Sequence, residues 1–127
     1  MIVLDASAAL SGLLNAGPAR MTMSEQQVHV PHLIDSEVAS GLSRRVAAQQ
    51  ISGGDGWAAL DVWRRLAVTR YAVTPVLDRI WELRDNVSAH DAGYIALAER
   101  LGCAVVTADA RLSRAPGIRC PVMVVPR

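Results

Sequence analysis

The chain has 127 residues, 51% of them hydrophobic and 20% charged, and a formal net charge of +1, which excludes a disordered segment. The length fits one domain over residues 1–127 that buries about two thirds of its unfolded surface. With no apolar run of the roughly 18 residues needed to span a membrane and no basic residue before Arg20, we expect a soluble cytoplasmic protein without a signal peptide.

The first part of the chain alternates short apolar runs with stretches of helical periodicity. We expect a buried strand at Ile2–Leu4, a helix capped by Ser7 that stops near Gly17, a short helix over residues 19–26 and a strand over 28–30. Apolar residues then recur every four positions from Ile34 to Val46, which predicts one face of a longer helix.

The second part follows the same alternation after a glycine-rich break at residues 52–56. Asp55 is a candidate cap for a helix over 57–67, and Gly102 for the left-handed end of a helix over 91–101. The other expected elements are an extended piece at 68–73, a helix at 75–84 and strands at Ala104–Thr107 and 122–125. The alternation predicts an α/β fold, with a parallel sheet covered by helices on both faces.

Four acidic residues stand at informative points of this pattern. Asp5 and Asp109 each end an apolar strand, and Glu37 and Asp91 lie early in expected helices. Reactive groups of an open parallel sheet gather outside the carboxyl ends of its strands, so we expect these acids to share one crevice. Crowded carboxylates repel one another unless a cation binds them, which favours a divalent metal and metal-assisted hydrolysis.

Each acid also has a purely structural explanation. Asp91 follows Ser88 by three residues, as in a variant of the capping box. Asp5 and Asp109 could each cap the turn that follows, and Glu37 could pair with an arginine of its own helix, such as Arg44. The combination still favours a site, because an apolar strand runs directly into an aspartate twice.

The other metal-ligand residue types show no such pattern. Cys103 and Cys120 stand singly, without zinc-ligand spacing, and we expect reduced, buried thiols. His29 alternates with valines, as a strand residue does. The absence of lysine excludes a receiver domain, Ser7 stands where a dehalogenase-type phosphatase needs a second aspartate, and the glycine-rich run lacks the end of a phosphate loop.

Four segments resemble the motifs of PIN-domain ribonucleases, in particular VapC-type toxins of bacterial toxin–antitoxin pairs. They are residues 3–10 (VLDASAAL), 30–31 (VP) with Glu37 and Val38, 91–98 (DAGYIALA) and 106–112 (VTADARL). The resemblance implies a PIN fold and an acidic site of Asp5, Glu37, Asp91 and Asp109 that binds Mg²⁺ or Mn²⁺, with Ser7 and Thr107 as supporting hydroxyls. His90 departs from the family, in which an aromatic residue usually precedes the aspartate.

The resemblance also implies partners, namely an RNA substrate, a small antitoxin that lies in a groove of the toxin, and a second copy in a homodimer. The helix after the glycine-rich break is a candidate partner surface. Its residues Trp57, Leu60 and Trp63 give it more apolar area than one stripe buried against the core requires. The alternative is that the tryptophans pack into the core.

Arginine supplies all 13 basic residues of the chain, which suits a phosphate polymer and also fits a codon bias. Arg84 and Arg111 flank the acidic segments and are candidate substrate contacts, although an arginine at a helix end is common. The resemblance to PIN-domain ribonucleases implies a metal-dependent endoribonuclease in which a metal-activated water attacks the phosphodiester. The alternative is a catalytically weak PIN-like module that binds RNA or protein.

Overall fold

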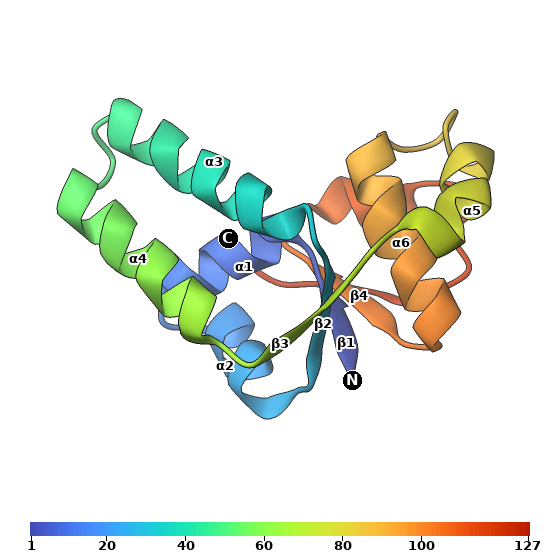
Figure 1. The fold of residues 1–127 in the computed structure, drawn as a ribbon, viewed down its shortest axis with the longest axis horizontal. Helices are drawn as coiled ribbons and strands as arrows, with labels where there is room; N and C mark the ends of the chain where they lie inside the picture. Colours follow the sequence, from blue (N-terminus) through green and yellow to red (C-terminus); the bar gives the residue numbers. More distant parts are fainter.

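A five-stranded, entirely parallel sheet forms the centre of the computed structural model, which describes all 127 residues (Figure 1). The strand order is β3-β2-β1-β4-β5, so the first strand lies in the middle and the chain builds outward on both sides. The strands are β1 (Ile2–Leu4), β2 (Val28–Pro31), β3 (Val68–Tyr71), β4 (Ala104–Thr107) and β5 (Val122–Val124). The expected α/β fold is confirmed.

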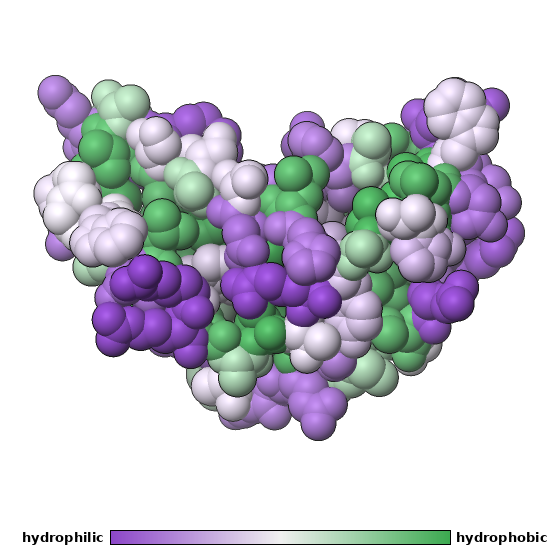
Figure 2. All heavy atoms as spheres, viewed as in Figure 1, coloured by the Kyte–Doolittle hydropathy of each residue, from purple (hydrophilic) through white to green (hydrophobic).

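Helices cover both faces of this sheet. In Figure 1 helices α1 to α4 gather on one side, with α3 and α4 as a projecting hairpin, and α5 and α6 pack together on the other side. The space-filling view shows that the surface is hollowed between the α3–α4 hairpin and the α5–α6 pair (Figure 2). The helices are α1 (Ala6–Leu14), α2 (Pro18–Glu25), α3 (Ile34–Ala47), α4 (Gly53–Arg65), α5 (Leu77–Glu82) and α6 (Ala89–Leu101), with short 3₁₀ turns η1 (Thr74–Val76) and η2 (Ala110–Arg114). None of these helices is long and apolar enough to cross a membrane.

Two helices begin earlier than expected, because a different residue caps each one. Asp5, not Ser7, caps α1, and its carboxylate accepts a hydrogen bond from the backbone N–H of Ala8. Ser52, not Asp55, caps α4 and accepts from the backbone N–H of Asp55. Gly102 ends α6 in the left-handed conformation at φ 70°, as predicted.

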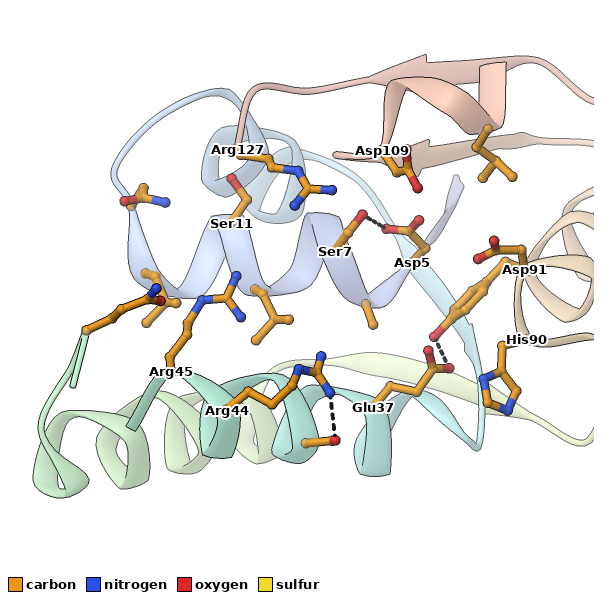
Figure 3. A pocket seen from close by; sticks show the side chains of 18 of the residues that line it. Asp5, Ser7, Ser11, Glu37, Arg44, Arg45, His90, Asp91, Asp109 and Arg127 are labelled. Carbon is orange, nitrogen blue, oxygen red and sulfur yellow. Dashed lines mark hydrogen bonds between the residues drawn. The ribbon is translucent and has the colours of Figure 1, made fainter. Parts of the chain in front are cut away.

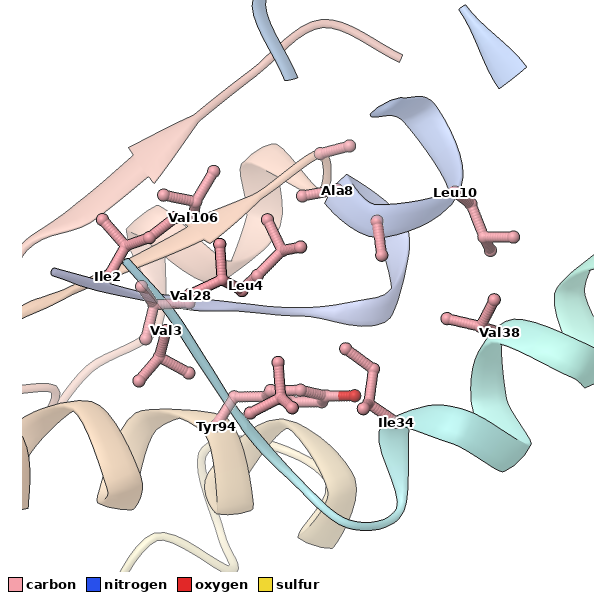
Figure 4. Close-up of a cluster of buried hydrophobic side chains, with 14 of the residues drawn as sticks. Ile2, Val3, Leu4, Ala8, Leu10, Val28, Ile34, Val38, Tyr94 and Val106 are labelled. Carbon is pink, nitrogen blue, oxygen red and sulfur yellow. The ribbon is translucent and has the colours of Figure 1, made fainter. Parts of the chain in front are cut away.

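The core lies on both sides of β1, whose three residues are all buried (Figure 4). Val3 and Leu4 are fully covered, and the ring of Tyr94 from α6 packs beneath the sheet near Ile34 of α3. The two cysteines are free, as predicted, although they are half-buried rather than fully buried. His29 is a β2 residue whose Nδ1 lies 2.7 Å from the hydroxyl of Tyr71.

The two tryptophans of α4 have opposite environments, which corrects the expectation that both belong to a partner surface. Trp63 is only 1% exposed, and its indole N–H donates to Asp35 at 2.8 Å, so this side chain belongs to the core. Trp57 is 57% exposed on the other face of the helix, where Arg64 lies over its ring. Leu60 is half-buried and packs against the core.

We expect Trp63→Ala to lower the free energy of unfolding by about 3–5 kcal/mol, because it leaves a large cavity and removes a partner of Asp35. Trp57→Ala should cost about 1 kcal/mol or less, since the ring is exposed and loses mainly its contact with Arg64. Urea denaturation of both variants measures the difference. Equal losses would contradict the buried and exposed assignments.

Candidate active site

The four acidic residues line one cleft of about 710 Å³ (Figure 3). The sheet accounts for two of them, because Leu4 and Val106 are register partners in β1 and β4, and Asp5 and Asp109 follow those strands. The first turns of α3 and α6 bring Glu37 and Asp91 to the same place from the other side. Residues more than 100 positions apart in the sequence therefore meet at the carboxyl edge of the sheet.

Asp5 is the most deeply buried of these acids, with 5% of its surface exposed. Ser7 donates a hydrogen bond to its Oδ1 at 2.7 Å, and Thr107 donates to its Oδ2. Burial raises the pKa of the Asp5 carboxyl, and the nearby charge of Asp91 raises it further, while the hydrogen bonds from Thr107, Ala8 and Ser7 oppose that rise. The Asp5 carboxylate is thus fixed in orientation by hydrogen bonds, but no basic side chain forms an ion pair with it.

Glu37 and Asp91 enter the cleft from two helices. The hydroxyl of Tyr94 donates to Oε1 of Glu37 at 2.8 Å, and burial together with the charge of Glu37 raises the pKa of this tyrosine, so the hydroxyl keeps its proton. Ser88 caps α6 by accepting a hydrogen bond from the backbone N–H of Asp91, which is one half of the expected capping box. The carboxylate of Asp91 does not return the bond to Ser88 and lines the cleft instead.

Asp109 lines the cleft at its outer edge and pairs with Arg111. The guanidinium donates to both carboxylate oxygens, with an Nη2–Oδ2 distance of 3.0 Å. These hydrogen bonds hold the pKa of Asp109 below its usual value. Asp109 also accepts from the backbone N–H of Arg111 and caps η2. Arg111 itself is exposed and does not line the cleft.

The donor chemistry of the cleft fits a hard divalent cation, since carboxylate oxygens are the ligands that Mg²⁺ and Mn²⁺ prefer. Burial and the charge of Asp91 raise the pKa of Asp5, and a cation bound beside these carboxylates would favour the ionised form of Asp5. No three acidic, histidine or cysteine side chains stand close enough in this structure to hold an ion together. Glu37 is turned to Tyr94 and Asp109 to Arg111 instead.

Three arginines that the sequence does not mark as substrate contacts also line the cleft, namely Arg44, Arg45 and Arg127 (Figure 3). Arg44 does not form the ion pair with Glu37 that its position on the helix allowed, and donates to Ser40 instead. Helical periodicity could have indicated Arg44 and its neighbour Arg45. Arg44 follows Glu37 by seven residues, which is two turns, and so lies on the same face of the helix. No local signal marks Arg127. His90 lines the cleft beside Asp91.

Arg84 lies elsewhere. Its guanidinium stacks on the ring of Trp81, 4.6 Å from the centroid, and donates to the Trp81 carbonyl oxygen at 2.9 Å. Arg84 does not line the cleft, and its hydrogen bond to the carbonyl oxygen of Trp81, in the last turn of α5, fits the helix-end explanation.

Comparisons with known proteins show which family the chain is similar to. The family model described as PIN domain matches residues 2–118. The chain is 58% identical over 127 residues to Ribonuclease VapC9 of Mycobacterium tuberculosis, and the alignment covers 100% of both chains.

Solved structures share the fold at lower identity. VapC20 of Mycobacterium tuberculosis, described as a Sarcin-Ricin loop cleaving toxin, has a TM-score of 0.67 and 21% identity, covering 94% of this chain and 97% of its own. VapBC2 of Rickettsia felis, bound to a DNA fragment from its promoter, has a TM-score of 0.67 and 14% identity, covering 96% and 98%.

The raised pKa of Asp5 predicts that Asp5→Asn stabilises the protein in the presence of a chelator. Ionised Asp5 disfavours the folded state, and this penalty is absent below the carboxyl's unfolded pKa of about 3.9 and complete once the pH exceeds its folded pKa. The gain in melting temperature should therefore be larger at pH 7 than at pH 4. Thermal unfolding at both pH values tests this, and a pH-independent loss of stability would contradict it.

Proposed function

This chain belongs to the PIN-domain family and, within it, to the VapC ribonucleases, and from this premise we propose that it is a Mg²⁺- or Mn²⁺-dependent endoribonuclease that acts as the toxin of a type II toxin–antitoxin pair. The observation that carries the proposal is that four carboxylates, from four separate segments, line one cleft. A purely structural role for these acids would not require them to share a cleft.

In this proposal Asp5 and Asp91 are the principal metal ligands, and Asp109 completes the site. When bound, the cation would lower the pKa of a water molecule and neutralise charge that develops on the phosphate. Ser7 and Thr107 fix the Asp5 carboxylate through the hydrogen bonds they donate, so the ligand needs little reorganisation.

Glu37 orients the attacking water and accepts its proton. Tyr94 occupies Oε1 of Glu37, which leaves Oε2 for the water. The water oxygen bonds to phosphorus, one phosphodiester P–O bond breaks, and the leaving oxygen takes a proton from solvent. No side chain of this protein serves as a nucleophile in this scheme.

We expect Asp5→Asn and Asp91→Asn each to reduce RNA cleavage by at least about 100-fold, because each removes a charge at the reacting centre. Cleavage of total RNA with Mg²⁺ or Mn²⁺, and with excess chelator, is the measurement, and the mapped fragments also locate the cleavage site. Asp61→Asn is the matched control, because Asp61 pairs with Arg64 and Arg65 on α4, outside the cleft. Full activity in both cleft variants, or in the chelator, would refute the proposal.

We also propose an antitoxin partner and a homodimer, as the resemblance to VapC toxins implies. The proposed antitoxin surface is the outer face of α4, where Trp57 and Val62 are 57% and 51% exposed. Leu60 beside them contributes its half-buried edge. Trp63 takes no part in this surface, because it is buried.

We expect Trp57→Ala to weaken antitoxin binding at least about tenfold, as is usual for an exposed tryptophan at the centre of an interface. The antitoxin is sought as the product of a short neighbouring reading frame, and growth rescue on co-expression and tryptophan fluorescence report its binding. Trp81→Ala is a close control, because Trp81 is also exposed and stacked with an arginine, but on α5. Equal effects of the two substitutions would reject the α4 surface.

A further inference from the structure

The cleft is divided by charge. Its carboxylates gather where β1, β4, α3 and α6 meet, and Arg44 and Arg45 lie farther along α3 (Figure 3). Arg127 enters the cleft from the C-terminal segment, where its guanidinium donates to the carbonyl oxygen of Ala108. Five arginines elsewhere in the molecule pair with carboxylates, which are Arg64, Arg65, Arg70, Arg79 and Arg111. None of the three cleft arginines forms such an ion pair, although the hydrogen bonds from Arg111 and, to a smaller extent, the charge of Arg127 hold the pKa of Asp109 below its usual value. Their guanidinium groups are therefore available to an anion from outside the chain.

The bonds that these three side chains do make are few and neutral. Arg44 donates to the hydroxyl of Ser40 at 2.9 Å, Arg45 to the Gly41 carbonyl oxygen at 3.0 Å, and Arg127 to the Ala108 carbonyl oxygen at 3.3 Å. A guanidinium has five N–H donors, so most of the donors in each group remain free. Free donors and uncompensated charge within a cleft are the properties of an anion-binding surface.

The backbones that carry the arginines are held by the fold. Arg44 and Arg45 belong to the last turn of α3, where the helix dipole favours cations. The segment before Arg127 is tied down twice, because Ser11 donates to the Pro126 carbonyl oxygen at 2.8 Å and the backbone N–H of Val125 donates to Thr107 at 2.8 Å. The arginine end of the cleft is thus placed relative to Asp5.

We propose that Arg44, Arg45 and Arg127 bind phosphates of single-stranded RNA beyond the scissile phosphate, so that the strand runs along α3 from the acidic end of the cleft to the arginine end. This inference rests on the proposed nuclease function. The backbone of Arg44 lies two helical turns from that of Glu37, about 10 Å along the axis, and its guanidinium is bonded to Ser40 between them. We therefore assign Arg44 to a phosphate next to the one that reacts beside Glu37. Guanidinium groups bind phosphate oxygens in a bidentate manner.

The composition of the cleft favours a nucleic acid over a peptide at this place. Only six of the 19 residues that line it are hydrophobic, which suits a polar strand better than the apolar face of an amphipathic helix. An acidic peptide would be repelled by the carboxylates at the other end, whereas a divalent cation held by those carboxylates would offset the charge of an RNA phosphate there.

The salt dependence of RNA binding is the first test. The probe is a labelled single-stranded RNA oligonucleotide in excess chelator, so that no cleavage occurs, bound to the wild type and to Arg44→Ala/Arg45→Ala/Arg127→Ala. Each phosphate contact contributes about 0.7 to the slope of log affinity against log salt, so the triple variant should flatten that slope by about 2. Replacing the same arginines by lysine should keep most of the slope.

Arg100→Ala is the matched control, because Arg100 is exposed near the far end of α6 from Asp91 and outside the cleft. Arg100→Ala should leave the slope of log affinity against log salt within about 0.7 of the wild-type slope, which corresponds to the loss of at most one phosphate contact. A triple variant with the affinity and slope of the wild type would overturn the inference. So would a triple variant that loses binding of the purified antitoxin and keeps binding of RNA.

A second test locates the contact on the RNA. Oligonucleotides of one sequence, each with a single neutral methylphosphonate linkage, are bound to the wild type and to Arg44→Ala/Arg45→Ala. Linkages on one side of the mapped cleavage site should weaken the wild type several-fold and weaken the variant no further, which is the coupling expected of groups in contact. If the neutral linkage lowers the RNA affinity of the variant by the same factor as that of the wild type at every position, the arginines and the phosphates are not in contact, and the inference is overturned.

Kinetics separate this inference from the proposed function. Contacts to flanking phosphates are the same in the ground state and the transition state, so the triple variant should raise KM at least about tenfold and change kcat less than about threefold. Cleavage whose KM is independent of the arginines would sink this inference alone. Arginine-dependent RNA binding without any metal-dependent cleavage by the wild type would support the contact and sink the proposed function.

Discussion

The Asp5 carboxylate at the end of β1 is the group on which the geometry of the site depends. It accepts hydrogen bonds from the backbone N–H of Ala8 and from the hydroxyls of Ser7 and Thr107, so one side chain caps α1 and ties β1 to β4. Ser7 in turn accepts from the backbone N–H of Ala108, and Thr107 from that of Asp109. The same hydrogen bonds that start a helix therefore place the next aspartate of the cleft.

Burying this carboxylate has an electrostatic cost that the rest of the site modulates. Burial and the charge of Asp91 disfavour its ionised form, and the hydroxyls recover only part of that loss. At the cleft edge Arg111 balances Asp109, while no basic side chain pairs with Asp5, Glu37 or Asp91. The uncompensated negative charge is thus confined to the place where a cation is proposed to bind, and the uncompensated arginines lie farther along the same cleft.

A second network fixes the helix that joins the two ends of the cleft. Asp35, at the start of α3, accepts from Trp63 of α4 at 2.8 Å and pairs with Arg70 of β3, also at 2.8 Å. The hydrogen bonds from Arg70 hold the pKa of Asp35 below its usual value, so this carboxylate stays ionised and keeps both partners. Because α3 carries Glu37 near one end and Arg44 near the other, its position sets the geometry of both.

The sequence by itself determined the α/β alternation, most element positions and the aspartates at the strand ends, because short-range periodicity and capping chemistry encode these features. It also carried the family resemblance that the comparisons confirm. Tertiary structure decided which face of α4 is buried, since both faces carry a tryptophan and only Trp63 packs into the core and donates to Asp35. It also placed Arg127 in the cleft and stacked Arg84 on Trp81, because these positions depend on contacts between segments that no local pattern records.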